Sequence, residues 1–595
     1  MPDLDTPTGH DDAGRPNEGA WWHRAAFPAL AVLLMAATSA PYLVAAVSTQ
    51  EGETFTGLVF NATDTNQYLA WIRDGSQLQV LFFNRFTPEP HPALLLKPFF
   101  LVLGWLSALT GLAPVAVYHL ARLIMCLAIV WGIDRFTRTT LARPLPRLAA
   151  TAVACFSGGL GMPLQRLGVS FPERLIEQPI DFWVPEIFVF QTAYLFPHLL
   201  FALLLMLLII ERFHQGLVSG TSRPIAAAAG LAVLLALVHP FDLVVVHTTI
   251  GALTLLALWW RRRHWRFALT ALVVVAAPSS GVVGLNAMVL NSHEAFATML
   301  SSSQTTPSFS QVALGLGAGP VLLALVLIPL GQVWLSQRRP PENLQSRRAR
   351  KKLAKGAGAH RRSKRPLDRP EWPDWIVPAV MLATIVLLVT LPVFALRRRF
   401  LMGIGIPVAI LLIRGIHSLA QRWFQRSLRL RRVAWAGVAV LMALLLLPGS
   451  ALRPLHDLEH ELGPPHRRAA YYHTEGQRAV FEWLQVNASG DDVVLSDWRT
   501  SNTLPAYTDV RVYAGHWNHT VDYRRRIGRL RHVLQTGRGA HELVRDNRIT
   551  LVVVLRAQDR GRRLQTIFGG LPGAEVVFRH EEAVVIRVAP GEAKE

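Results

Sequence analysis

The stretch RRRFLMGIGIPVAILL, residues 397–412, places three consecutive arginines directly before an apolar run. Similar apolar runs recur along the chain of 595 residues, 51% of which are hydrophobic. A helix needs about 20 such residues to cross a hydrocarbon core of roughly 30 Å. The sequence therefore predicts a polytopic α-helical membrane protein.

The basic residues orient the predicted helices, because cytoplasmic loops normally collect Lys and Arg. With the amino terminus inside, this rule gives about 11 transmembrane helices. The predicted spans are 26–47, 115–133, one from 148, 186–210, two joined at 239–240, 267–289, one ending near 336, 375–396, 400–416 and 433–447. This order puts Arg397, Arg398 and Arg399 outside, against the rule, which indicates an anionic partner there such as a lipid phosphate.

The long segment 48–114 is predicted to be one outer loop that carries surface helices. Its apolar stretch 93–109 is not counted as a span, because that count would put a basic loop outside; Lys97 and Pro98 also favour a surface helix. The predicted organisation is a disordered cytoplasmic tail (1–25), a transmembrane domain (26–450) with a basic cytoplasmic loop (337–372), and an extracytoplasmic α/β domain (453–595).

The α/β prediction rests on five short β-like runs, which alternate with polar helical segments. These runs are DDVVLSD, VRVYAG, ITLVVVL, AEVVF and AVVIRV. The formal charge of +21 does not indicate nucleic-acid binding, because the basic residues lie mainly in the short loops that orient membrane helices. The two cysteines, Cys126 and Cys155, lie inside apolar runs, so we expect neither a disulfide framework nor a metal site built on sulfur.

Asp64 stands in FNATDTNQYLAWIRDG, where the outer loop turns into an amphipathic helix. One interpretation makes Asp64 the N-cap of that helix, because its carboxylate can accept from unpaired backbone N–H groups. The other makes it a catalytic group that takes a proton from an acceptor hydroxyl or orients it for attack. The residue pattern alone favours the cap.

Polar residues at membrane depth usually face a cavity. Glu186, Gln191, Tyr194 and His198 follow one another along one predicted span, so we expect this helix to line a site, although Glu186 also suits the helix dipole alone. His239 and Asp242 are predicted to form a hydrogen-bonded bend with a role in acceptor binding. Asp64 and Glu186 are acids that suit a divalent cation such as Mg²⁺ or Mn²⁺, but no spacing requires one.

The order of helices and two motifs resemble the GT-C glycosyltransferases, which include protein mannosyltransferases and aminoarabinose transferases. The motifs are the first outer loop, with Asp64 and then HPALLLKPFF leading to GLAPVAVYHLARLI, and the stretch RRRFLMGIGIPVAILL. The resemblance implies a polyprenyl-phosphate sugar as donor, a catalytic role for Asp64 and an outer domain that helps to bind the acceptor. The chain departs from the mannosyltransferases in that Thr63 and Thr65, and no second acid, flank Asp64.

The expected function is transfer of a hexose or pentose, with inversion at the anomeric carbon, from a polyprenyl-phosphate donor to a glycan, lipid or protein at the outer face of the plasma membrane. Arg397, Arg398, Arg399 and Lys97 are expected to bind the donor phosphate. The segment AGHWNHTVDYRRR has side chains that suit sugars, although an ordinary capped turn explains it too. A transporter or lipid flippase and a non-catalytic scaffold are the alternatives.

Overall fold

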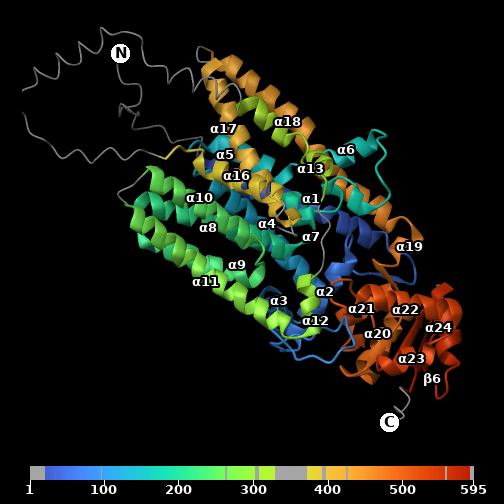
Figure 1. Ribbon diagram of the computed structural model, residues 1–595. Helices are drawn as coiled ribbons and strands as arrows, with labels where there is room; N and C mark the ends of the chain where they lie inside the picture. Colours follow the sequence, from blue (N-terminus) through green and yellow to red (C-terminus); the bar gives the residue numbers. More distant parts are fainter. Residues whose placement is uncertain are drawn as a thin grey trace, which may run out of the picture.

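The computed structural model describes residues 20–95, 97–260, 264–301, 307–327, 372–391, 397–423, 427–555 and 559–589. The predicted tail therefore lies outside the described residues up to residue 19, and the predicted basic loop up to residue 371. The described part is mostly helical, with a small sheet domain at the carboxyl-terminal end (Figure 1).

Long apolar helices form the larger part of the molecule. Its helices are α1 (Ala20–Val47), α2 (Ala62–Ser76), α3 (Pro98–Thr110), α4 (Pro114–Thr137), α5 (Pro144–Phe156), α6 (Gly161–Arg166), α7 (Val189–Leu195), α8 (Pro197–Ser219), α9 (Ser222–Val238), α10 (Asp242–Trp260), α11 (Trp265–Asn291), α12 (Glu294–Ser301), α13 (Phe309–Leu316), α16 (Ile376–Thr390), α17 (Gly405–Trp423) and α18 (Leu428–Asp457). Proline occupies the first position of α3, α4, α5 and α8, where its missing N–H would have no partner in any case.

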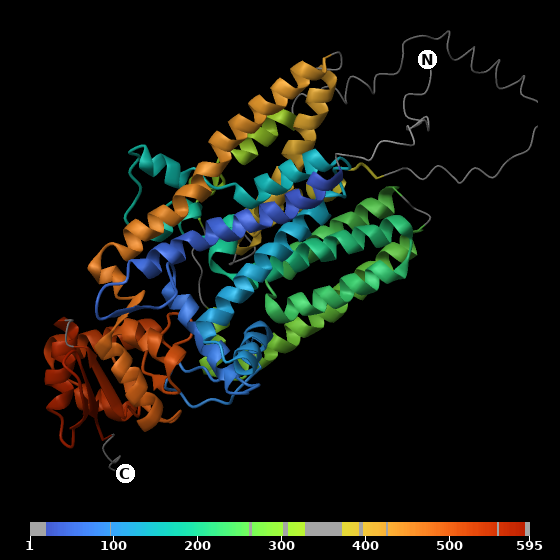
Figure 2. The same cartoon turned by 180° about the vertical axis from the view of Figure 1, so that it is seen from behind.

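Within the described ranges, 6 helices are long and apolar enough to cross a membrane, or 7 if the bent pair Phe309–Leu316 and Gly319–Leu327 counts as one span. Four shorter apolar helices, α3, α5, α9 and α16, accompany them. The helices α8, α9, α10 and α11 pack side by side (Figure 1), and α1 packs on α4 beside α18 (Figure 2). This arrangement agrees with a multi-pass membrane protein, whereas the count of eleven spans stays a prediction.

Two predicted spans have different boundaries from those expected. The span predicted over 186–210 is broken: a 3-10 turn, η3 (Pro185–Ile187), precedes the short α7, and α8 begins only at Pro197. Phe196 between them is extended, with φ −130°, because a residue before proline is disfavoured in the helical region. In the span predicted from Phe400, the α-helix begins at Gly405, and Arg397–Leu401 form the 3-10 helix η5 in front of it.

The segment between α1 and α4 lies against the carboxyl-terminal part of the chain. Its strand β1 (Glu53–Phe55) pairs antiparallel with β2 (Tyr472–Thr474). The helices α2 and α3 cross closely at two glycines, where a Cβ on Gly104 would lie 2.5 Å from the Cα of Gly75. Any larger residue at Gly104 would therefore push α2 away from α3.

The carboxyl-terminal part contains a five-stranded mixed sheet of order β4-β3-β5-β7-β6. The strands β3 (Val493–Leu495), β4 (Arg511–Val512), β5 (Leu551–Leu555) and β7 (Ala583–Arg587) each lie within one of the five predicted runs, and β6 (Glu575–Arg579) extends one residue beyond the run AEVVF. β3 is parallel to β4 and β5, whereas β7 is antiparallel to both of its neighbours.

Helices cover both faces of this sheet. Val494 and Val553 point to α20 (Glu475–Asn487) and α21 (Trp498–Tyr507), whose apolar side chains share a core cluster with them. Val552 and Val554 belong to a second cluster, with side chains of α22 (Tyr523–Thr536), α23 (Ala540–Asp546) and α24 (Asp559–Gly569). The alternation along β5 thus fixes a three-layer packing. Four short helices lie elsewhere in the described part of the chain: η1 (Leu175–Glu177), η2 (Ile180–Phe182), η6 (Leu458–Leu462) and α19 (Pro465–Arg468).

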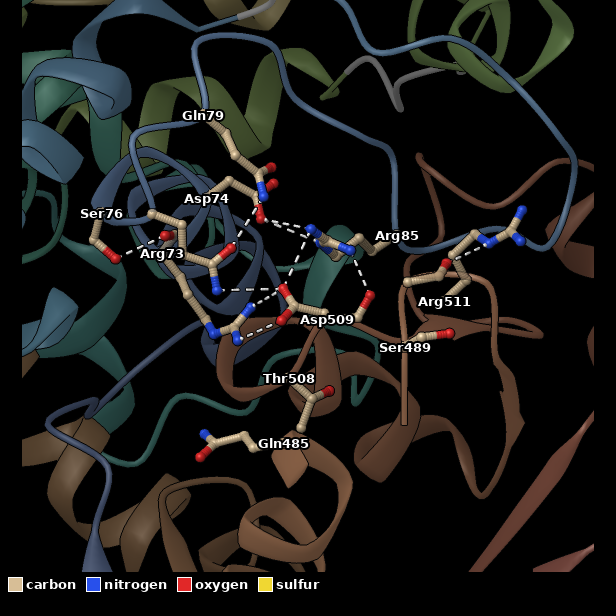
Figure 3. Close-up of polar contacts among 12 residues, drawn as sticks. Arg73, Asp74, Ser76, Gln79, Arg85, Gln485, Ser489, Thr508, Asp509 and Arg511 are labelled. Carbon is tan, nitrogen blue, oxygen red and sulfur yellow. Dashed lines mark hydrogen bonds and ion pairs between the residues drawn. The ribbon is translucent and has the colours of Figure 1, made fainter. Parts of the chain in front are cut away.

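Charged residues join α2 to this domain, as Figure 3 shows. Arg73 donates to both carboxylate oxygens of Asp509, at 2.6 and 3.1 Å. Arg85 donates to Asp74 Oδ1 from Nε at 3.2 Å and from Nη2 at 3.0 Å, and also to the Asp509 carbonyl. The Arg85 and Asp74 side chains are 6% and 1% exposed. This buried cluster holds α2 against α21, and α2 carries Asp64.

Candidate functional site

A cavity of about 270 Å³ lies where the membrane helices, the outer loop and the carboxyl-terminal domain meet. Its wall comes from α2, the start of α3 and of α8, η3, the corner between α9 and α10, η5, and the segment 516–519. Seven of the predicted site residues line it: Asp64, Lys97, Glu186, His198, His239, Arg398 and Arg399. The chain therefore gathers in one place residues that are up to 335 positions apart, from 64 to 399.

Asp64 is not the helix cap that the residue pattern favours. The cap of α2 is Asn61, whose side chain accepts from the Asp64 N–H at 3.4 Å. The Asn61 amide in turn donates to Asp64 Oδ2 at 2.9 Å. The cap position thus passes to Asn61, a residue with the same preference for this role, and the Asp64 carboxylate remains directed to the cavity.

The second partner of Asp64 comes from the carboxyl-terminal domain. His516 Nε2 lies 3.1 Å from Asp64 Oδ1, and the Asn518 N–H donates to His516 Nδ1 at 3.1 Å. Because Nδ1 accepts, the proton of the neutral ring lies on Nε2 and is donated to Asp64. Burial raises the pKa of Asp64, but the hydrogen bonds from His516 and Asn61 and the charge of Arg399 outweigh it, so the pKa lies below its usual value.

The cavity wall also contains three cationic side chains, Lys97, Arg398 and Arg399. The Arg398 guanidinium lies 5.1 Å from the centre of the Trp183 ring, and that of Arg399 lies 5.0 Å from the centre of Phe241. Lys97, which precedes α3, lies 5.8 Å from the centre of a Trp71 ring. Burial and, after it, the charge of Arg399 lower the pKa of Lys97 to about 8.

A buried pair of residues supports Arg399. His239 Nδ1 lies 2.8 Å from Asp242 Oδ2, and His239 Nε2 lies 3.4 Å from Arg399 Nη1. Because a guanidinium can only donate, Nε2 accepts and the His239 proton lies on Nδ1, where Asp242 accepts it. Asp242 itself is 1% exposed and does not line the cavity, so its contact with the site runs through His239.

Three further predicted residues lie outside the cavity wall. Arg397 is in η5 but does not line the cavity. Gln191 and Tyr194 are in α7, where Gln191 donates to the Asp181 carbonyl at 3.1 Å and the Tyr194 carbonyl accepts from Tyr42 at 2.7 Å. The expectation that Gln191 and Tyr194 line the site is therefore wrong. They belong to α7, which ends before the extended residue Phe196, and the helix that reaches the cavity, α8, begins only at Pro197.

Glu186 and His198 remain at the cavity, at either end of that break. The Glu186 carbonyl accepts from the Gly403 N–H at 3.2 Å, which ties η3 to the segment after η5. His198 is 7% exposed, with its ring centre 4.7 Å from that of Tyr68 and 5.1 Å from that of Phe100.

The residues present do not fit a divalent cation well. In the part of the chain that the structure describes, no group of three or more His, Cys, Asp or Glu side chains is placed to hold a metal ion. Both oxygens of Asp64 already accept hydrogen bonds, and Arg398 and Arg399 share the cavity with Glu186. A cation held by Asp64 and Glu186 therefore has no part in the reaction proposed below.

Several lining residues were not among the predicted site residues. His516, Trp517, Asn518 and His519 line the cavity in one group, and Gln67, Tyr68 and Trp71 line it from α2. The clustering of aromatic and hydrogen-bonding side chains in GHWNHT was the available signal for the first group. The helical spacing of Gln67, Tyr68 and Trp71 after Asp64 was the signal for the second.

No protein-family model matches this chain, and no curated protein matches it. Two solved structures of an oligosaccharyltransferase from Archaeoglobus fulgidus are similar to it. The first, archaeal AglB in complex with an inhibitory peptide and a dolichol-phosphate, is 14% identical, with 90% of this chain and 69% of that chain covered and a TM-score of 0.45. The second, in complex with Zn and sulfate, is 14% identical, with 88% and 68% covered and a TM-score of 0.46.

Proposed function

We propose that this protein is a membrane glycosyltransferase that moves one sugar from a polyprenyl-phosphate donor to an acceptor at the outer face of the plasma membrane. The observation that carries the proposal is one cavity whose wall contains both a carboxylate, Asp64, and the cationic side chains Arg398, Arg399 and Lys97. Group transfer from a phosphate needs both: a base for the attacking hydroxyl and cations for the anionic leaving group.

In the proposed reaction, the acceptor hydroxyl gives its proton to Asp64 while its oxygen forms a bond to the anomeric carbon. The bond between that carbon and the phosphate oxygen breaks, and its electron pair stays on the phosphate. Arg399 and Arg398 stabilise the charge that develops there, because cations in a partly buried site act more strongly than in water. Attack from the face opposite the phosphate inverts the anomeric configuration.

The positions of the basic residues support an outer location for the cavity. The helices α8 and α10 begin at the cavity, where His198 of α8 and Phe241, just before α10, lie in its wall. The helices α9 and α11 end at the cavity, where Val238 and Leu290 lie in its wall. The other ends of these helices carry basic residues, such as Arg223 and Arg266. Because cytoplasmic ends collect Lys and Arg, the cavity belongs to the outer end, and the carboxyl-terminal domain is extracytoplasmic.

The proposal is tested in a strain that lacks the gene, complemented with the wild type, Asp64→Asn or Asp491→Asn. Asp491 is a matched control, because it is a fully exposed aspartate of the carboxyl-terminal domain, with a side chain 102% exposed. Mass spectrometry of polyprenyl-phosphate sugars and of the envelope glycans, lipids and proteins provides the readout.

Loss of the gene should raise one polyprenyl-phosphate sugar and remove one sugar from an acceptor. Wild type and Asp491→Asn should reverse both changes, whereas Asp64→Asn should reverse neither while the protein is present in the membrane at a normal level. General base catalysis contributes about 10²- to 10⁴-fold, so full complementation by Asp64→Asn would refute the proposed role of this residue. An unchanged donor pool and unchanged acceptors would refute the transferase itself.

A further inference from the structure

The contact between His516 and Asp64 joins two parts of the chain that are 452 positions apart. Asp64 belongs to the helix after the first membrane span, and His516 to the segment between β4 and α22 of the carboxyl-terminal domain. The His516 side chain is 2% exposed and that of Asp64 is 31% exposed. The carboxylate therefore faces the cavity, while the imidazole behind it is enclosed.

The segment that carries His516 is held firmly from both sides. The backbone N–H groups of Gly515 and His516 both donate to Thr520 Oγ1 at 3.2 Å, and that hydroxyl donates to the Phe86 carbonyl at 2.6 Å. On the other side, the Asn502 amide donates to the Gly515 carbonyl at 3.0 Å and to the Thr63 carbonyl, next to Asp64, at 3.1 Å. His516 thus has a fixed position relative to the first turn of α2.

We propose that His516 is a positioning residue for Asp64, so that the carboxyl-terminal domain supplies part of the transfer site. This inference rests on the proposed function, because it assigns His516 a task only if Asp64 acts on the acceptor. With Asn61 on Oδ2 and His516 on Oδ1, the plane of the carboxylate is fixed, and each oxygen keeps a further lone pair for the acceptor hydroxyl.

His516 is not itself placed to take the acceptor proton. Its Nδ1 accepts from the Asn518 N–H and its Nε2 proton is donated to Asp64, so both ring nitrogens already have partners. A neutral imidazole in this tautomer orients the carboxylate without neutralising it. Without His516, Asp64 Oδ1 loses this hydrogen bond, and the remaining bond from Asn61 to Oδ2 no longer fixes the plane of the carboxylate.

Loss of His516 also has an effect on pH dependence. The charged and titratable groups that face Asp64 are His516, Tyr68 of its own helix, His198 of α8, and Arg398 and Arg399 of η5. After burial, which raises the pKa of Asp64, the largest effect on it is the hydrogen bond from His516, which lowers it. Asp64 acts as the carboxylate, so activity falls as the pH drops through this pKa, and removal of His516 should move that fall to higher pH.

The experiment compares full-length wild type with His516→Ala, His516→Gln and Asp64→Asn in membranes. The donor is the polyprenyl-phosphate sugar extracted from the deletion strain, the acceptor is the envelope fraction of that strain, and released polyprenyl phosphate is measured against pH. His532→Ala is the matched control, because His532 is exposed on α22 and does not line the cavity.

His516→Ala should lower kcat by about 10- to 100-fold with little change of the donor KM, because misplacement of a catalytic group costs about 100-fold. The acid limb of the pH profile should move to higher pH. His516→Gln keeps an N–H donor near the position of Nε2, so it should restore most of the lost kcat and return most of the acid limb to its wild-type pH. His532→Ala should match the wild type.

Two results would overturn the inference while leaving the transferase intact. One is an inactive Asp64→Asn variant beside a His516→Ala variant with wild-type kcat and acid limb. The other is a loss in His516→Ala that His516→Gln does not restore and that leaves the acid limb unmoved, which identifies a purely structural role. Transfer at the wild-type rate by Asp64→Asn instead overturns the proposed function of Asp64, on which the inference depends.

Discussion

Replacement of Arg85 by methionine should loosen the contact between α2 and the carboxyl-terminal domain. Arg85 is the only side chain in the described ranges that hydrogen-bonds the Asp74 carboxylate, and Asp74 is 1% exposed. The variant leaves that carboxylate buried without its partner, and it also loses the hydrogen bond to the Asp509 carbonyl. Breaking a buried pair from one side costs about 3–5 kcal/mol. At 1.4 kcal/mol for each factor of ten, opening of this contact should become at least about 100-fold more frequent.

The cost should depend on pH. Burial raises the pKa of Asp74, and Arg85 lowers it by a smaller amount, so the folded-state value lies above the usual range. Without Arg85 this pKa rises further, and protonation at low pH removes the unpaired charge. The destabilisation by Arg85→Met should therefore be larger at pH 8 than at pH 5.

Hydrogen exchange followed by mass spectrometry measures this opening in the intact protein, through peptides from α2 and α21. Arg85→Met should speed their exchange, and the double variant Asp74→Leu, Arg85→Met should restore slow exchange, because an apolar pair can replace a buried ion pair at little cost. Arg174→Met is the control, since Arg174 pairs with Glu177 on the surface, with side chains 80% and 48% exposed, and such pairs contribute about 0–1 kcal/mol. Unchanged exchange of α2 in Arg85→Met at pH 8, or no recovery in the double variant, would refute this reasoning.

Two predictions concern the cationic side of the cavity. The pKa of Lys97 is about 8, so the donor KM of the wild type should rise above about pH 8. Lys97→Arg should move this rise to higher pH, whereas a donor KM that does not change in Lys97→Met would exclude the lysine from donor binding. Arg399→Met should raise the donor KM by about tenfold or more, because hydrogen bonds to charged groups contribute about 1.5–3 kcal/mol, whereas Arg397→Met, in the same turn but outside the cavity wall, should leave it near the wild-type value. Equal effects of the two arginine variants would contradict this assignment.

Much of the architecture follows from local patterns. The corner at His239 and Pro240 and the five strands lie where the sequence predicts them, because proline and short apolar runs act on neighbouring residues only. The break before Pro197 was also visible in principle, since the residue before a proline avoids the helical region. A long apolar run concealed it, because proline is common in membrane helices.

The composition of the site could be predicted only in part. Asp64, Lys97, Arg398 and Arg399 are charges in apolar surroundings, which single them out in the sequence. The contact of His516 with Asp64, by contrast, depends on the docking of a domain far along the chain, and no local periodicity records such a contact. Its only local trace is the unusual grouping of polar and aromatic residues in GHWNHT.

The arrangement of opposite charges in the cavity is itself an argument for a substrate between them. In a partly buried site, a carboxylate and two guanidinium groups attract one another strongly. Asn61 and His516 hydrogen-bond Asp64, while His239 contacts Arg399 and Trp183 lies against Arg398. These contacts hold the carboxylate and the guanidinium groups in the wall of one cavity, which preorganises it for a ligand that carries both a hydroxyl and a phosphate.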